Sequence, residues 1–113
     1  MQPLPISCSV TLMFRELPMT QRFAAARAAR FDGVEIQLLN EASPGEIVAA
    51  ARAAELPVVL VNVGMGDFLA GGYGLAAVPG REGSFIEEFA TTLRMARQLG
   101  SRYIHLGPSR IPE

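Results

Sequence analysis

The order of apolar and polar positions predicts strands and helices that alternate along the chain. Four short apolar stretches, several of them rich in β-branched residues, are typical of strands: 6–14, 33–38, 57–63 and 102–106. Between them, apolar residues recur at three- and four-residue steps, as in amphipathic helices, over 20–30, 43–54 and 82–99. Because strands that alternate with helices pair in parallel through right-handed crossovers, this order predicts a parallel α/β sheet.

Residues at the ends of the predicted helices indicate where each helix begins and ends. Ser43, Pro44 and Glu46 form a capping-box pattern, and Gly100 follows the last periodic residue of the third helix. Thr20 is a candidate cap for the first helix. The periodicity of that helix turns its polar residues mostly outward: Gln21, Arg22, Arg27 and Arg30.

The strand at 57–63 leads into the longest connection of the chain. The strand is apolar up to Asn62, and the loop behind it, which ends at Glu82, holds six of the eleven glycines: Gly64, Gly66, Gly71, Gly72, Gly74 and Gly80. Loops this long are uncommon in compact domains and are usually lids or binding loops. The pattern therefore predicts that this loop borders a binding site.

Two closures of a parallel sheet fit this order: an open doubly wound sheet, and half of a (β/α)8 barrel. No G-x-G-x-x-G pattern follows the first strand, which weighs against a dinucleotide-binding open sheet. The last predicted strand has no covering helix after it. We therefore predict an α/β fold that is the N-terminal half, about four βα units, of a TIM barrel. Residues 1–113 would form one partial domain truncated after its fourth strand.

Composition disfavours several classes of function. Ten basic and eleven acidic residues give a net charge of −1, and no basic patch suited to nucleic acid is present. No apolar run approaches the ~18 residues of a membrane span, and no charged leader precedes an apolar run. Every basic residue is Arg, which excludes a Schiff-base or phosphate-loop lysine. The single Cys8 excludes an internal disulfide, and a buried thiol in a reducing, cytoplasmic setting is expected.

Ligands of parallel α/β folds lie at the carboxyl ends of the strands, so polar residues there are the candidates for a binding site. We predict five substrate-binding residues: Glu35, Asn62, Asp67, Arg81 and His105. Each has a structural alternative. Glu35 could pair with an Arg at the sheet edge, Asn62 could tie down loop backbone, and Asp67 could cap a turn. His105 could be a hydrogen-bonded core histidine, and Arg81 could form a surface pair with the glutamate beside it.

A complete catalytic set is missing from the sequence. A divalent metal or an acid–base pair requires several carboxylates or histidines that converge. Glu35 and His105 alone do not make such a set, and Glu113 is the only acidic residue after His105. No nucleophile-elbow or HExxH motif is present. We therefore predict no catalytic residue and no metal ligand within this chain.

Residues 66–82, GDFLAGGYGLAAVPGRE, resemble the hydroxypyruvate isomerase family, in which an Asn-containing strand runs into a G-D-aromatic segment that ends in P-G-R-E. Other stretches are similar in the same order along nearly all of the chain: Ser9 with the run 12–14, FDGVEI at 31–36, and ARQLGSRYIH at 96–105. The loop pattern is fairly specific. The DGVE stretch is shared by the wider sugar isomerase and endonuclease IV-like barrels.

The resemblance implies a xylose isomerase-like (β/α)8 barrel of about 250 residues. It also implies an aldose–ketose isomerisation between hydroxypyruvate and tartronate semialdehyde, in carbohydrate and glyoxylate metabolism. In related barrels two glutamates move a proton between adjacent carbons and a divalent metal stabilises the enediolate. Those residues lie on later strands, beyond Glu113. We therefore expect a divalent metal in the full-length fold and no turnover by the 113-residue chain alone.

The chain departs from the family pattern at three places. Phe68 stands where Trp is common, Tyr73 stands where Arg is common, and 39–43 lacks an aromatic, Pro-rich loop. Because Tyr73 replaces that Arg, the residue that would bind a substrate carboxylate is not identified by the resemblance.

One alternative is therefore a related isomerase of a four-carbon oxo-acid, of the 2-oxo-tetronate type. Another is a non-catalytic half-barrel that self-associates through its uncovered sheet edge into a homo-oligomer. The absence of a basic surface disfavours an endonuclease IV-like nuclease. The expected partner is a small hydroxy- or oxo-acid, with no nucleic acid and no membrane.

Overall fold

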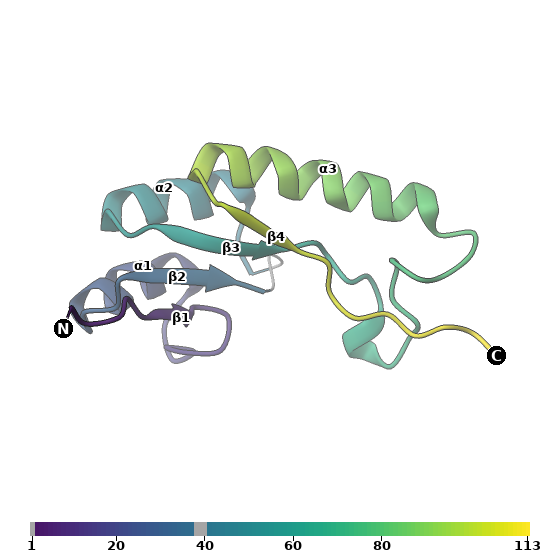
Figure 1. Ribbon diagram of the computed structural model, residues 1–113, viewed down its shortest axis with the longest axis horizontal. Helices are drawn as coiled ribbons and strands as arrows, with labels where there is room; N and C mark the ends of the chain where they lie inside the picture. The colour runs from purple at the N-terminus through teal and green to yellow at the C-terminus, as the bar shows by residue number, and fades with distance from the viewer. Residues whose placement is uncertain (1, 38–40) are drawn as a thin grey trace.

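A computed structural model describes residues 2–37 and 41–113 and shows one sheet of parallel strands flanked by helices (Figure 1). In chain order the elements are β1 (Ser7–Ser9), α1 (Met19–Ala28), β2 (Gly33–Ile36), α2 (Pro44–Ala54), β3 (Val58–Asn62), the 3-10 helix η1 (Phe68–Ala70), α3 (Glu82–Leu99) and β4 (Tyr103–His105). The strand order is β1-β2-β3-β4, and every neighbouring pair is parallel. The alternation of strands and helices predicted from the sequence is confirmed.

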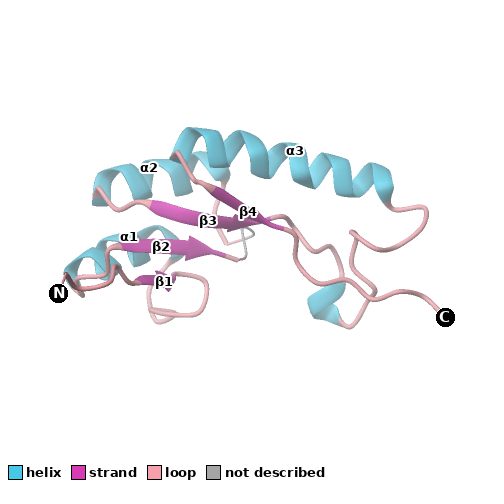
Figure 2. Ribbon diagram, viewed as in Figure 1, coloured by secondary structure: helices cyan, strands magenta, loops and turns pink. Residues whose placement is uncertain are grey.

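The three α-helices pack against one face of the sheet, and they leave the opposite face open (Figure 2). A single hydrophobic core joins them. On and beside the strands its residues are Cys8, Val10, Val34, Ile36, Val58 and Val61, and its helix residues are Met19, Phe23, Ala26, Ile47, Val48, Ala51 and Met95. Side chains alternate across a strand, so the residues between these positions face the other way, except that a register shift between β2 and β3 leaves Val59 as an extra residue. We call that side the open face: Ser7, Ser9, Glu35, Gln37, Leu60, Asn62, Tyr103 and His105.

The helix boundaries follow the sequence signals closely at α2 and α3. Ser43 and Glu46 form the predicted capping box at the start of α2, with each residue's side chain bound to the other's backbone N–H. α3 spans the predicted residues, and Gly100 ends it with φ of +66°. A left-handed residue after the last turn is easiest for glycine, which has no Cβ.

Two boundaries near the N-terminus differ from the prediction. The first strand is confined to Ser7–Ser9, because the chain turns after Ser9, where the amides of Leu12 and Met13 bind the Ser9 carbonyl at 3.2 and 2.9 Å. Thr20 is not a cap: α1 follows Pro18, and no side-chain cap binds its first turn. The predicted end of the second strand at Leu38 lies outside the described residues.

Arg22 corrects the sequence prediction most clearly, since it is 4% exposed rather than facing outward. Its Nη1 donates to the Val10 carbonyl at 3.0 Å and to the Glu41 carboxylate at 2.7 Å, and its Nε donates to the Leu17 carbonyl at 3.0 Å. The periodicity predicted a solvated arginine because a sequence pattern does not reveal where the backbone carbonyls of the loop after β1 lie. The buried guanidinium ties that loop to α1 and to the segment before α2.

Replacing Arg22 by Met should lower the free energy of unfolding by about 2–4 kcal/mol, because the carbonyls of Val10 and Leu17 and the carboxylate of Glu41 would lose their donor. Chemical denaturation measures the loss. Arg27→Met is the matched control on the exposed side of the same helix, where only one exposed hydrogen bond, to the Glu55 carbonyl at 3.0 Å, is lost and about 1 kcal/mol or less is expected. Equal effects at the two positions would show that burial of Arg22 contributes no stability.

Candidate functional site

The strand register places the polar residues of the open face in rows that run across the sheet. Partner residues in a parallel pair lie on the same face, and Ser9, Glu35, Leu60 and Tyr103 are joined in this way by successive pairs. Two of the predicted site residues, Asn62 and His105, are partners at the carboxyl ends of β3 and β4. Three predicted residues, Glu35, Asn62 and His105, therefore share one face.

Glu35 lies in a network of side chains on the open face. Its carboxylate accepts hydrogen bonds from Ser7 Oγ at 3.3 Å and from Gln37 Nε2 at 3.1 Å. The Gln37 side-chain oxygen accepts from Ser9 Oγ, and the Gln37 backbone N–H donates to Thr11 Oγ1 at 2.9 Å. The predicted alternative of an Arg partner for Glu35 is not found among the described ion pairs. The carboxylate is held by neutral donors and remains half-buried.

Ser7, Ser9 and Gln37 were not on the list of candidates from the sequence. The sequence feature that could have identified them is a spacing of two residues, between Ser7 and Ser9 and between Glu35 and Gln37. In a strand that spacing places both members on one face, so the pairs mark a polar strip. The strip belongs to the site because it fixes the position of the Glu35 carboxylate.

Asn62 is 5% exposed, and its Oδ1 atom has no hydrogen-bond partner among the described residues. A buried amide oxygen without a donor costs about 1–3 kcal/mol. Native structures pair most such atoms, so this orphaned acceptor at the carboxyl end of a strand makes Asn62 a candidate for ligand contact. The structural alternative, in which Asn62 ties down loop backbone, finds no partner at Oδ1 among the described residues.

His105 is an exposed residue on β4, which forms an edge of the described sheet. Its backbone carbonyl accepts the amide of Val63 at 2.9 Å, which continues the ladder between β3 and β4. The alternative of a hydrogen-bonded core histidine is wrong, because its side chain lies on the uncovered face next to Asn62. The ring is therefore accessible from solvent.

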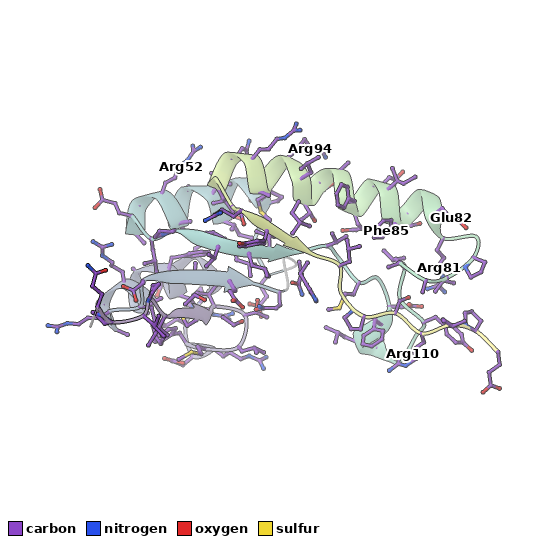
Figure 3. The ribbon with its side chains drawn as sticks, viewed as in Figure 1. Arg52, Arg81, Glu82, Phe85, Arg94 and Arg110 are labelled. Atoms are coloured by element: carbon purple, nitrogen blue, oxygen red, sulfur yellow. The ribbon has the colours of Figure 1, made fainter. Side chains whose placement is uncertain are left out.

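Asp67 and Arg81 form a second group, inside the loop between β3 and α3 (Figure 3). Asp67 Oδ1 accepts from the Gly74 amide and from Arg81 Nη1, each at 2.9 Å, and Arg81 Nη1 also donates to the Gly74 carbonyl at 2.8 Å. The Gly74 N–H, followed by the Arg81 guanidinium, lowers the pKa of Asp67 below its ordinary value of 3.8. These two residues bind each other and hold the loop in shape. None of their hydrogen bonds given above involves Glu35.

The described residues do not fit a divalent metal by themselves. Across 2–37 and 41–113, no three side chains of His, Cys, Asp or Glu lie close enough to hold an ion. Glu35 and His105 carry suitable atoms, but they stand on opposite sides of β3 in the sheet. Any metal ligands of the family reaction are therefore not assembled by this part of the chain.

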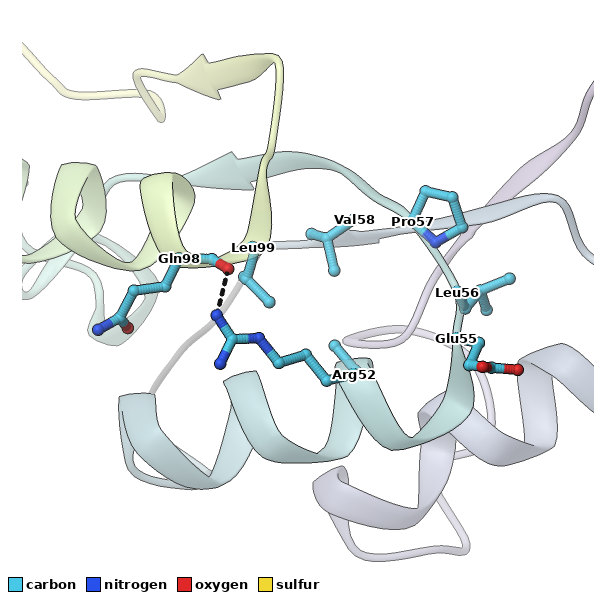
Figure 4. A pocket seen from close by; sticks show the side chains of 8 residues that line it. Arg52, Glu55, Leu56, Pro57, Val58, Gln98 and Leu99 are labelled. Atoms are coloured by element: carbon cyan, nitrogen blue, oxygen red, sulfur yellow. Dashed lines mark hydrogen bonds between the residues drawn. The ribbon is translucent and has the colours of Figure 1, made fainter.

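One cavity, of about 320 Å³, lies between the C-terminal ends of α2 and α3 (Figure 4). Its lining residues include Arg52, whose Nη2 donates to the Gln98 carbonyl at 3.0 Å, and Leu99. Pro57 and Val58, at the start of β3, line it as well. It is therefore at the amino ends of the strands, opposite the site, where ligands of parallel folds are not expected.

Among the described helices, none is both long and apolar enough to cross a membrane.

Known proteins resemble this chain over nearly its whole length. A protein from Mus musculus named "Putative hydroxypyruvate isomerase" is 39% identical over 100% of this chain and 41% of its own length. A 2-oxo-tetronate isomerase from Cupriavidus necator is 36% identical over 94% of this chain and 41% of its own length. The crystal structure of an AP endonuclease, family 2, from Brucella melitensis superposes with a TM-score of 0.82 at 32% identity, over 94% of this chain and 42% of that chain. No family model matches.

The chain is thus similar to proteins named hydroxypyruvate isomerase and 2-oxo-tetronate isomerase, the resemblance that the 66–82 loop predicts. It spans about 41% of the length of these curated relatives. The structural superposition confirms the predicted fold class: a parallel α/β unit that matches part of a TIM barrel.

Replacing Gly72 by Ala should displace the Asp67 carboxylate, because a Cβ at Gly72 would overlap its carbon and both oxygens. We expect faster hydrogen exchange at the Gly74 amide and a rise of the Asp67 pKa toward 3.8, since the bonds that lower it would break. NMR titration measures both. Gly83→Ala is the control, because no atom lies within 4 Å of a Cβ there. An unchanged Asp67 pKa in the Gly72 variant would contradict the packing.

Proposed function

We propose that this chain provides the first part of a (β/α)8-barrel isomerase that interconverts hydroxypyruvate and tartronate semialdehyde. Its similarity to the hydroxypyruvate isomerases supports the reaction class, and the open face with its polar carboxyl end supports a small hydroxy- or oxo-acid as substrate. On this proposal the protein works in the cytoplasm, in carbohydrate and glyoxylate metabolism.

The orphaned Asn62 Oδ1 is the observation that carries the proposal. It is an acceptor, so it would receive a hydrogen bond from a hydroxyl group of the substrate. Hydroxypyruvate and tartronate semialdehyde both carry a hydroxyl on a carbon beside the carbonyl that the reaction moves. A buried acceptor at this place favours binding of a ligand with a hydroxyl group, and an analogue without that hydroxyl should bind more weakly.

The neighbouring side chains would orient the substrate around Asn62. The exposed His105 ring lies on the same face, on the adjoining strand, and can donate or accept a hydrogen bond. Glu35 keeps a fixed orientation through Ser7 and Gln37, and it forms a polar wall on the other side of β3. We assign these residues to binding. The glutamates that move the proton and the ligands of the divalent metal would come from βα units that follow these in the full barrel.

A four-carbon 2-oxo-tetronate is the second candidate substrate. The 36% identity with the Cupriavidus necator isomerase favours it, and Tyr73 departs from the loop of the hydroxypyruvate enzymes. The two acids share the hydroxyl beside the carbonyl and differ in length, so Asn62 does not discriminate between them.

Nuclease activity, which the name of the Brucella melitensis neighbour brings to mind, is less well supported. Contacts to phosphates dominate nucleic-acid affinity and require a basic surface. The chain has a net charge of −1, and the open face presents the carboxylate of Glu35. We therefore propose a small-molecule substrate.

The assay that tests this function uses the complete protein that carries these residues, purified with Mg²⁺, Mn²⁺ or Co²⁺. Conversion of hydroxypyruvate to tartronate semialdehyde, followed by coupled reduction of the aldehyde, is expected to exceed conversion of 2-oxo-tetronate. The 113-residue chain alone is expected to give no turnover, because its described residues assemble no metal site. A preference for 2-oxo-tetronate would select the second candidate, and inactivity on both acids would reject isomerisation.

Asn62→Ala should lower kcat/KM about tenfold, because the substrate hydroxyl would lose its acceptor. Thr92→Val is a matched control, since Thr92 Oγ1 is also buried without a partner but lies on α3, away from the open face. That change should leave kinetics intact and raise stability by about 1 kcal/mol. Kinetics and thermal denaturation of both variants separate the roles. An Asn62 variant with normal kinetics would make this residue purely structural.

A further inference from the structure

The segment that follows β4 lies along the loop between β3 and α3, although the two are far apart in sequence (Figure 1). The Arg110 amide and Ser109 Oγ both donate to the Tyr73 carbonyl, at 2.7 and 2.8 Å, and Ser109 Oγ accepts from the Ala77 amide at 3.2 Å. Gly74 permits this approach: its φ is +85°, and a Cβ there would stand 3.1 Å from Ser109 Oγ. The two segments form one joined structure at the carboxyl end of the sheet.

Arg110 is held within this structure by an aromatic ring and by backbone oxygens. Its guanidinium lies over the Phe68 ring, 4.3 Å from the ring centre, and its Nη1 donates to the carbonyls of Gly72 and Phe68. A stacked and bonded guanidinium loses little further rotational freedom when it binds an anion. Arg110 is therefore already oriented for binding.

The charge of Arg110 has no partner among the described residues. Arg22 pairs with Glu41 and Arg81 with Asp67, but no carboxylate lies within ion-pair distance of Arg110. Its Nε and Nη2 donors are also without described hydrogen-bond partners. A guanidinium offers its donors in a fork that fits both oxygens of a carboxylate. Two donors are thus available for an anion.

Arg110 lies against the loop between β3 and α3, because its backbone amide donates to the Tyr73 carbonyl. Figure 3 shows Arg110 on the side of the loop away from α3, whereas Arg81 lies near the start of that helix.

We propose that Arg110 binds the carboxylate of the oxo-acid substrate and selects acids over neutral sugars. The proposal rests on the proposed function, since it names the group that recognises the acid end of that substrate. The Phe68 ring stacks against one face of the Arg110 guanidinium, and the hydrogen bond to the Gly72 carbonyl fixes the orientation of that group. Arg81 is already paired with Asp67, whereas Arg110 has no carboxylate partner among the described residues.

The test compares Arg110→Met and Arg110→Lys in the complete protein. Loss of a charge-assisted pair should raise KM for hydroxypyruvate at least about tenfold in the Met variant, with kcat changed less than about twofold. The Lys variant, which keeps the charge but loses the fork and the stack, should fall between. Turnover of the neutral analogue glyceraldehyde, which has no carboxylate, should not change between the variants.

Arg102→Met is the matched control. Arg102 is also exposed and also lies over an aromatic ring, that of Tyr103 at 5.8 Å, but it stands at the amino end of β4. Its loss should leave KM unchanged. If Arg110→Met raises KM no more than Arg102→Met does, or if it slows glyceraldehyde to the same extent as hydroxypyruvate, Arg110 is only a clamp on the loop and the proposal fails.

Direct binding separates this proposal from the proposed function. Tartronate, a stable three-carbon dicarboxylate, is titrated into the ¹⁵N-labelled protein while the Arg110 Nε–H resonance is followed by NMR. A saturable shift at Arg110, absent at Arg102, supports carboxylate binding even if the protein turns over neither oxo-acid. Isomerase activity without such a shift would overturn the role of Arg110 and leave the proposed function standing.

Discussion

The structure depends on the burial of one face of a parallel sheet beneath three helices. Val34, Ile36 and Val61 must face those helices, and strand alternation then fixes which residues face the other way. The polar character of the open face is therefore set by the core and not by the loops. Glu35 and Asn62 each lie next to a core residue, and His105 is the strand partner of Asn62.

Two arginines hold the connections that border this surface, and they do so in different environments. Arg22 is buried and satisfies carbonyls of the loop after β1. Arg81 is partly exposed and closes the loop after β3 through Asp67 and Gly74. In both places a guanidinium binds backbone oxygens that have no strand or helix partner, which lets irregular chain keep a defined shape. The chain has no lysine, and a guanidinium offers five donors in a planar fork against the three of an ammonium group.

Much of the fold could be predicted from the sequence because the signals were local. β-branched runs marked β3, and the Ser43–Glu46 box and the period of α3 fixed those helices closely. The position of Asn62 at the end of a strand also placed it correctly. The burial of Arg22 depends on loop carbonyls whose positions the sequence does not reveal, and its outward prediction was wrong for that reason.

The site was harder to predict because it depends on contacts between distant segments. Asp67 and Arg81 were both candidates, but nothing local showed that they bind each other across 14 positions. Gln37 was passed over although its spacing from Glu35 put both on one face. The docking of Arg110 against Tyr73 crosses more than 30 positions, and no periodic pattern encodes it.

The burial of Cys8 has a practical consequence. This thiol, the only one in the chain, is 5% exposed, and burial, with a smaller effect from Glu35, raises its pKa. It therefore reacts with alkylating reagents only while an opening of the fold exposes the core around it. The alkylation rate of the native protein thus reports how often this part of the core opens, with no label or substitution required.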